Sequence, residues 1–207
     1  RAGQVVLCTN GFENITIFNT SGLEIDTRFH HLVHGVVGRM FGYIEDISKP
    51  PTAISYYVRP QLGFDEMTDP YFYLTRRLYD QDTSTPALGH NLTCVGGPQE
   101  TVSSRAEYNQ DFEYPEEVDK STDKFLRTLY DIKDGKDLHY DFNWHGLMGY
   151  TTNGVRLVGA EPLNKVLLYN LGCNGVGILP SIFGGDRIAR LISGEKLPPS
   201  IFDPKER

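Results

Sequence analysis

The sequence predicts an α+β fold, because several strand-like runs without helices between them precede one amphipathic helix and a final strand–turn–helix unit. β-branched and aromatic residues dominate these runs, and clusters of Pro, Gly, Asp and Ser separate them. Consecutive strands of this kind are typical of an antiparallel sheet. The strands of that sheet are expected at residues 32–44, 52–58, 71–79 and 91–95, with Gly96-Gly97-Pro98 closing the last of them.

A helix is expected over residues 115–132, because Pro115 and two glutamates stand at its start and apolar residues recur at helical spacing. The apolar stripe consists of Val118, Phe125, Leu126, Leu129 and Tyr130. Four further elements are expected: strands over 138–150, 155–158 and 165–171, and a helix over 178–193.

A short apolar run over residues 4–9 is closed by Asn10-Gly11 and predicts a buried parallel strand. Such a strand requires neighbouring strands and helices over its faces, and few residues precede this one. We therefore expect the chain to be part of a longer protein.

Acidic residues outnumber basic ones by 27 to 20, which gives the chain of 207 residues a formal net charge of −7. This balance argues against a broad cationic surface for nucleic acid or anionic lipid. No apolar run reaches the roughly 20 residues of a membrane helix. Cys8, Cys94 and Cys173 form no C-x-x-C pair, and His30 and His34 lack the glutamate of a zinc-binding helix. We expect a soluble, cytoplasmic protein with neither a disulfide framework nor a metal site.

The most informative local pattern is Gly172-x-x-Gly175-x-Gly177, which joins the last strand to the last helix. Glycines let backbone N–H groups converge on a ligand, and a helix N-terminus adds partial positive charge. We expect Gly175 and Gly177 to need either a positive φ or a close approach to a ligand. The order of the glycines differs from the dinucleotide fingerprint. The pattern therefore predicts either an anion site or a tight turn without a ligand.

The helix that follows this turn is expected to end at Gly194 and to bury one apolar face. That face consists of Ile178, Ile182, Gly185, Ala189 and Ile192.

Residues 71–79 alternate with period two, which sets Tyr73 and Arg77 on one face of their strand and Arg76 on the other. A face that carries tyrosine and arginine suits an anionic substrate. The same composition is also typical of a solvated face of a sheet.

Three segments, in this order, resemble FAD-dependent oxidoreductases of the D-amino-acid oxidase and glycine oxidase type. The segment Val5-Val-Leu-Cys-Thr-Asn-Gly11 is similar to the late Rossmann strand of that family. The segments from Trp144 to Gly159 and from Val166 to Gly177, with the helix that runs on to Glu195, resemble its C-terminal part. The strands between residues 32 and 98 fit the family's substrate domain by order and composition alone.

The resemblance implies an antiparallel substrate-domain sheet together with the closing strands and helix of a Rossmann-like FAD-binding domain. Residues 1–22 would end the FAD-binding domain, 23–143 would form the substrate domain, and 144–207 would return to the FAD-binding domain. The implied activity of the full-length parent is hydride transfer to FAD N5 from the carbon beside an amine, with an amine or amino acid as substrate. The chain alone is expected to be inactive.

The resemblance also assigns binding residues, although it identifies no catalytic residue. The cofactor-binding candidates are Gly146, Met148, Gly172, Cys173, Asn174, Gly175, Val176 and Gly177. The substrate-binding candidates, carried by the sheet, are Arg59, Tyr73, Arg76 and Arg77.

Three departures from the family pattern limit what the resemblance implies. The N-terminal G-x-G-x-x-G is absent, so FAD is expected in the full-length parent and not on this chain, whose partner would be the missing N-terminal half. Met148 and Gly175 stand where relatives that act on small α-amino acids carry arginine. Met148 also occupies the place from which sarcosine-oxidase relatives bond flavin covalently. The competing hypothesis is a non-catalytic ligand-binding module with an aromatic and arginine-bearing sheet face.

Overall fold

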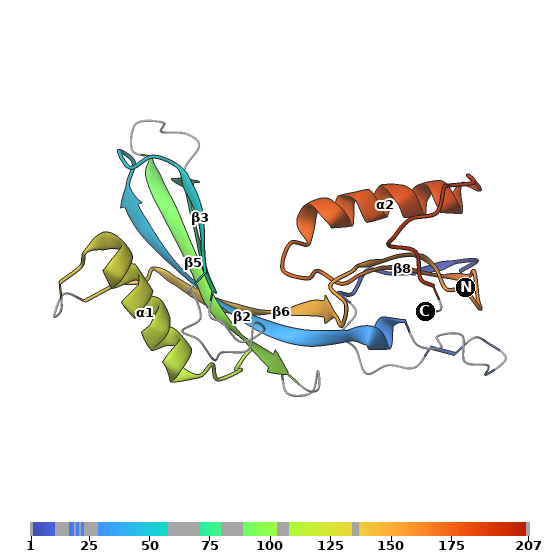
Figure 1. Ribbon diagram of the computed structural model, residues 1–207, viewed down its shortest axis with the longest axis horizontal. Coiled ribbons are helices and arrows are strands. Elements are labelled where there is room, and N and C mark those ends of the chain that lie inside the picture. Colours follow the sequence, from blue (N-terminus) through green and yellow to red (C-terminus); the bar gives the residue numbers. More distant parts are fainter. Residues whose placement is uncertain are drawn as a thin grey trace. The chain divides into compact units, whose positions relative to one another are not determined.

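The computed structural model describes residues 2–10, 17, 18, 20, 22, 29–57, 71–79, 89–102, 108–133 and 137–205. The predicted α+β class is confirmed, because these residues form mainly antiparallel sheets and two α-helices (Figure 1). In the same ranges, neither helix is long and apolar enough to cross a membrane. The elements are β1 (Val5–Leu7), the 3-10 turn η1 (His30–Leu32), β2 (Val33–Asp46), β3 (Thr52–Tyr57), β4 (Tyr71–Tyr79), β5 (His90–Val102), α1 (Glu116–Tyr130), β6 (Phe142–Thr151), β7 (Leu157–Ala160), β8 (Leu167–Leu171) and α2 (Ile178–Ile192).

The chain divides into two compact units, which we describe separately. The first unit comprises residues 1–36, 101–110 and 147–207, and the second comprises 37–100 and 111–146. The first therefore contains β1, β7, β8 and α2, and the second contains β3, β4 and α1.

The first unit contains a three-stranded sheet with the order β1-β8-β7. β1 runs parallel to β8, with Val5 opposite Leu167, and β7 runs antiparallel to β8. The parallel pairing predicted for the N-terminal strand is confirmed. Its predicted burial is not, because β1 lies at the edge of this sheet among the described residues and Val5 is exposed.

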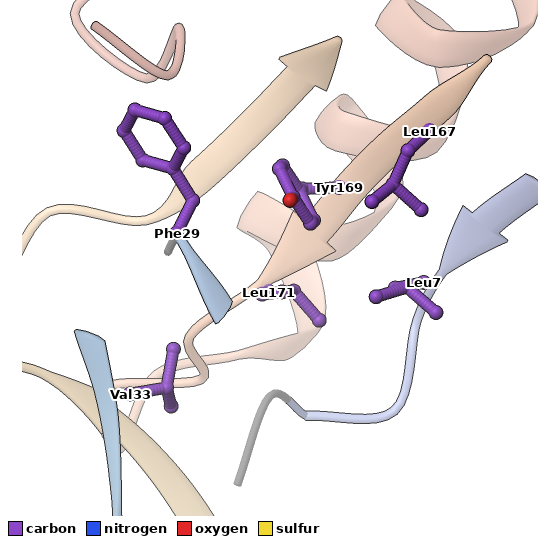
Figure 2. Close-up of a cluster of buried hydrophobic side chains, with 6 residues drawn as sticks. All are labelled: Leu7, Phe29, Val33, Leu167, Tyr169 and Leu171. Atoms are coloured by element: carbon purple, nitrogen blue, oxygen red, sulfur yellow. The ribbon is translucent and has the colours of Figure 1, made fainter. Parts of the chain in front are cut away.

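β8 is buried on both of its faces. Successive side chains of a strand point to opposite sides, and Leu167, Leu168 and Tyr169 are all buried. One face joins a core cluster drawn in Figure 2: Leu7, Phe29, Val33, Leu167, Tyr169 and Leu171. On the other face, Leu168 packs with Val158 of β7 and Ile188 of α2. The strand thus anchors both the sheet and the helix of this unit.

The face of α2 that packs on the sheet differs from the face predicted. Gly184, Arg187 and Ile188 are its buried residues, whereas Ile178 is 79% exposed and Ile182 is 66% exposed. The apolar face predicted from helical spacing is therefore directed to solvent in the part of the chain that the structure describes.

Two contacts explain this orientation of α2. A Cβ at Gly184 would collide with the Asn170 side chain, so only glycine lets the helix approach β8 this closely. Arg187 forms an ion pair with Asp203, with 2.6 Å between its Nη2 and the carboxylate oxygen. Both are long-range contacts, which helical periodicity does not encode.

The second unit is built on a five-stranded sheet with the order β3-β4-β5-β2-β6. β3, β4 and β5 pair antiparallel, as predicted, with Ile54 opposite Leu74 and Leu74 opposite Val95. α1 covers one face of this sheet. Its Leu126 packs into a cluster with Phe41, Leu74 and Val95, and the ring of Phe125 stacks on Phe72 at a centroid distance of 4.4 Å.

The strand expected to end at residue 95 continues through Gly96-Gly97-Pro98 to the end of β5. A Cβ at Gly96 would collide with the ring of Tyr73, and one at Gly97 would lie 2.7 Å from the Thr122 hydroxyl of α1. The two glycines therefore permit close packing on either side of a continuing strand and do not form a turn.

Other boundaries also differ from the sequence prediction. β2 covers Val33–Asp46 and not 32–44, and β8 covers Leu167–Leu171 and not 165–171. β6 begins at Phe142 and not at residue 138, because Leu138 and Tyr140 pack against the core cluster under α1 before the strand starts. β7 covers Leu157–Ala160 and not 155–158. β4 has the predicted bounds, and α2 ends one residue before the predicted end.

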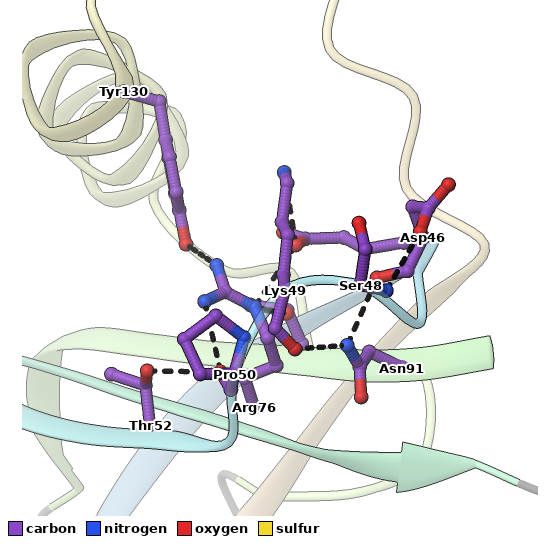
Figure 3. Close-up of polar contacts among 10 residues, drawn as sticks. Asp46, Ser48, Lys49, Pro50, Thr52, Arg76, Asn91 and Tyr130 are labelled. Carbon is purple, nitrogen blue, oxygen red and sulfur yellow. Dashed lines mark hydrogen bonds and ion pairs between the residues drawn. The ribbon is translucent and has the colours of Figure 1, made fainter.

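A buried polar cluster lies between α1 and the sheet of the second unit. The guanidinium of Arg76 donates from Nε to Glu45 at 3.0 Å and to the Thr93 hydroxyl at 3.3 Å, and from Nη2 to the Tyr130 hydroxyl at 2.6 Å. Lys49 pairs with the same oxygen of Glu45 at 3.1 Å. Figure 3 shows Tyr130 of α1 reaching down to Arg76 on the sheet.

The protonation of Glu45 is coupled to this cluster. Burial by itself raises the pKa of the Glu45 carboxyl, but Lys49, the Tyr43 hydroxyl and Arg76 together lower it below its usual value. Since the pKa is lower in the folded state than in the unfolded state, folding favours the ionised form. The resulting stabilisation is complete above the unfolded-state pKa of about 4.3 and is lost as the pH falls through the folded-state pKa.

We expect the free energy of unfolding to fall as the pH decreases from about 6 to about 3, and to fall less steeply in Glu45→Gln, which cannot titrate at this position. Urea unfolding at a series of pH values measures both slopes. Equal slopes for the two proteins would show that the ionisation of Glu45 does not contribute.

Candidate functional site

The turn between β8 and α2, residues 172–177, takes the backbone conformations that its glycines permit. We call it the glycine-rich turn. Gly172 and Gly175 have φ of 83° and 76°, and Asn174 between them has φ of 49°. The positive φ expected at Gly175 is confirmed. Gly177 instead has φ of −69° at the helix N-cap, where a Cβ would lie 2.8 Å from the sulfur of Cys173.

Asn174 fastens the glycine-rich turn to the end of β6. Its side-chain oxygen accepts hydrogen bonds from the backbone N–H of Thr151 at 2.8 Å and from the Thr151 hydroxyl at 3.3 Å. Its side-chain nitrogen donates to the carbonyl of Gly154 at 3.1 Å, and its backbone N–H donates to the carbonyl of Gly149 at 3.0 Å. One asparagine thus holds the turn through both its side chain and its backbone.

Asn10, just beyond β1, makes a second connection to the same turn. Its carbonyl accepts a hydrogen bond from the N–H of Gly172 at 3.4 Å, and its side chain donates to the carbonyl of Leu147 at 3.2 Å. A Cβ at Gly149 would collide with that Asn10 carbonyl. The three segments that carry the family resemblance therefore meet in the first unit.

Arg156 lies beneath the glycine-rich turn and is only 6% exposed. Its guanidinium donates to the Gly172 carbonyl at 2.9 Å, to the Asn170 side-chain oxygen at 3.0 Å and to the Ser181 hydroxyl at 2.9 Å. These acceptors belong to the turn, to β8 and to the first turns of α2. A single side chain therefore fixes the start of the helix relative to the strand.

The charge of Arg156 is not balanced by an ion pair with any acid among the described residues. Burial lowers the pKa of its guanidinium, although far too little to remove the charge at neutral pH. A buried cation whose partners are neutral keeps a positive potential around the turn. Sequence reasoning missed this residue, because an arginine just before a strand carries no local signal of burial.

The N-terminus of α2 is open. No side chain caps it, and its first turn carries no acidic residue. The first N–H groups of a helix have no partner within the helix. Around them, Val176, Ile178 and Leu179 are between 74% and 79% exposed. An open helix N-terminus among exposed apolar side chains suits a flat, largely apolar molecule with an electron-rich edge.

The remaining cofactor-binding candidates lie close to this turn in the chain or on β6. Gly146 and Met148 are half-buried residues of β6, and a Cβ at Gly146 would meet nothing within 4 Å. Cys173 is half-buried, with its sulfur packed against Gly177.

The substrate-binding candidates lie on β4 in the second unit, apart from Arg59, which is outside the described residues. The hydroxyl of Tyr73 donates to the sulfur of Met40 at 3.0 Å. Arg77 is exposed on the same face, and Arg76 on the opposite face belongs to the buried cluster under α1. The predicted period-two alternation is therefore confirmed.

Across the described ranges, no group of three or more His, Cys, Asp or Glu residues is arranged to hold a metal ion.

Comparison with known proteins finds similarity of structure only. No protein-family model matches the chain, and no curated protein sequence matches it. Among solved structures, glycine oxidase from Geobacillus kaustophilus matches with a TM-score of 0.53 and 15% identity, over 84% of this chain and 40% of that one. The chain thus spans about two fifths of that enzyme's length, and at this identity the match shows a similar fold.

Two further structures match less well. Glycine oxidase from Bacillus cereus ATCC 14579 has a TM-score of 0.49 and 18% identity, over 82% of this chain and 38% of that one. Iminodiacetate oxidase from Chelativorans sp. BNC1 has a TM-score of 0.47 and 13% identity, over 90% of this chain and 48% of that one. They add nothing to what the first match shows.

We expect Arg156→Lys to lower the free energy of unfolding by about 2 kcal/mol, because an ammonium keeps the charge but cannot reach three acceptors as a planar guanidinium does. Urea unfolding measures this loss. Arg190→Lys, in an exposed ion pair on the same helix, is the matched control and is expected to change stability little. Equal effects of the two substitutions would contradict a structural role for Arg156.

Proposed function

We propose that this chain is the C-terminal portion of a flavin-dependent oxidoreductase that acts on an amine or amino acid. The observation that carries the proposal is the open N-terminus of α2, which follows a glycine-rich turn and is surrounded by exposed apolar side chains. The fold similarity to glycine oxidase supports the same conclusion. When bound, FAD would supply an acceptor, at its N5, for a hydride from the carbon beside the amine.

The residues of the site fit an isoalloxazine ring system. Val176, Ile178 and Leu179 offer apolar contact to a flat ring, and the N–H groups at the start of α2 offer donors to its electron-rich pyrimidine edge. A helix N-terminus stabilises negative charge there by about 0.3 to 1 kcal/mol when exposed, and by up to about 2 kcal/mol when partly buried. The positive charge of Arg156 acts in the same direction.

The substrate would be held by the exposed face of β4. Arg77 is a suitable partner for an acidic group on the substrate, with the Tyr73 side chain on the same face of the strand. Arg76 is not available for this role, because its donors are engaged by Glu45, Thr93 and Tyr130. Along one strand, residues 73 and 77 are roughly 13 Å apart. This spacing favours a longer amine or amino acid over glycine.

The partner of this chain would be the N-terminal half that binds the adenosine and pyrophosphate of FAD. That half has no counterpart among the motifs of this sequence, and the chain matches only 40% of the glycine oxidase structure. It would also cover Ile178 and Ile182, which are apolar and exposed. Burial of apolar surface is the main driving force for such an association.

The test is FAD binding by the 207-residue chain and by the full-length parent. We expect the chain alone to bind no stoichiometric FAD, because it provides only part of the contacts that offset the cost of ordering a large ligand. We expect the parent, or the chain combined with the missing half, to show protein-bound flavin absorbance near about 450 nm.

Gly175→Val in the parent is expected to remove this absorbance, because valine disfavours φ of 76° and would press on Tyr150. Gly3→Val, at a position where a side chain meets nothing and which is not a cofactor-binding candidate, is the control that should retain flavin. A colourless wild-type parent would contradict the proposal and favour a ligand-binding module.

A further inference from the structure

The hydroxyl of Tyr150 occupies the space that a side chain at position 175 would need. A Cβ at Gly175 would lie 2.5 Å from the hydroxyl oxygen and 3.5 Å from Cζ of the same ring. Gly175 is exposed, and Tyr150, on β6, is half-buried. A polar group from β6 therefore stands beside the glycine-rich turn, in the direction in which a longer side chain of the turn itself would point.

Contacts on both sides of Tyr150 in the chain fix the position of this hydroxyl. The carbonyl of Gly149 accepts a hydrogen bond from the backbone N–H of Asn174 at 3.0 Å, and the N–H of Thr151 donates to the Asn174 side-chain oxygen at 2.8 Å. The Tyr150 ring also lies near that of His34 in β2, with 6.2 Å between the ring centroids. Tyr150 is thus held beside the turn before a ligand binds, which lowers the entropic cost of binding.

The group at this place is neutral, and the cation that contacts the turn is already engaged. Arg156 is 6% exposed, and its Nη atoms donate to three neutral acceptors in the turn, β8 and α2. Met148 and Gly175, at the positions where relatives that act on small α-amino acids carry arginine, bring no charge. A carboxylate beside Tyr150 would meet a phenol hydroxyl, which binds an anion more weakly than a guanidinium does.

We propose that Tyr150 binds the amine group of the substrate, and that the carbon bearing this amine carries no carboxylate. The inference rests on the proposed function, which assigns the N–H groups at the start of α2 to the flavin. The Tyr150 hydroxyl donates to the lone pair of a neutral amine or accepts from its N–H. Specificity at this position is therefore for an amine and not for an α-amino acid.

Two probes that differ only in one carboxylate test the substrate class: δ-aminovalerate and α-aminoadipate, the latter as each enantiomer, given to the flavin-loaded parent. We expect kcat/KM to be at least about tenfold higher for δ-aminovalerate, because the extra carboxylate must leave water without a cationic partner. An equal or higher kcat/KM for α-aminoadipate, or no turnover of δ-aminovalerate by a parent that holds flavin, would overturn the proposal. A parent without flavin would contradict the proposed function itself, and this inference with it.

Tyr150→Phe in the parent removes the hydroxyl and keeps the ring. We expect the KM for δ-aminovalerate to rise about tenfold while the flavin absorbance is retained, because one hydrogen bond to the amine is lost. Tyr114→Phe is the matched control, since its hydroxyl donates to the carbonyl of Val37 at 2.7 Å in the second unit. This control is expected to keep the wild-type KM. A wild-type KM in Tyr150→Phe would contradict the proposed contact.

A double-mutant cycle on the 207-residue chain tests the geometry without flavin. Gly175→Ala is expected to lower the thermal unfolding midpoint, because alanine disfavours φ of 76° and its Cβ collides with the Tyr150 hydroxyl. In the Tyr150→Phe background the backbone strain remains but the collision with the oxygen is removed, so Gly175→Ala should lower the midpoint less. An equal loss in the two backgrounds would show that the hydroxyl does not occupy this place.

Discussion

Three hydrogen bonds from one buried guanidinium join the end of β8 to the beginning of α2. Arg156 holds the carbonyl of Gly172, the side chain of Asn170 and the hydroxyl of Ser181, and no acid among the described residues neutralises it. The Nε of this guanidinium is buried without a partner, so the stabilisation of the buried cation depends on the three acceptors of its Nη atoms, which cannot move apart without a large penalty. The path of the glycine-rich turn, and with it the direction of the helix N-terminus, depends on this arrangement.

The exposed apolar face of α2 follows from the same constraints. Gly184 lets the helix approach Asn170 of β8, and the ion pair of Arg187 with Asp203 fixes its rotation. With that rotation, Ile178 and Ile182 face away from the sheet. A contiguous exposed apolar helix face next to an open N-terminus is more typical of a binding surface than of a surface that contacts only solvent. It connects the local geometry of the turn to the proposed flavin and to the proposed N-terminal half.

Local patterns predicted much of the fold, and long-range contacts account for what they missed. The bounds of β4 and the existence of α1 and α2 follow from periodicity within one element. The continuation of β5 through Gly96 depends on Tyr73, which no local pattern includes. The positive φ of Gly175 was predictable from its residue type, whereas the role of Arg156 depends on acceptors at positions 170, 172 and 181. Arg76 was indistinguishable from Arg77 as a binding residue until its contacts with Glu45 and Tyr130 were known.

The central claim is that the start of α2 contacts the flavin in the full-length parent. Hydrogen–deuterium exchange of the parent with and without FAD, read over residues 172–183, tests it most directly. We expect FAD to slow exchange at the amides of Gly177, Ile178 and Leu179, because the first N–H groups of a helix have no partner within the helix until a ligand supplies one. Exchange in this segment that FAD leaves unchanged, while protecting other parts of the parent, would contradict the claim.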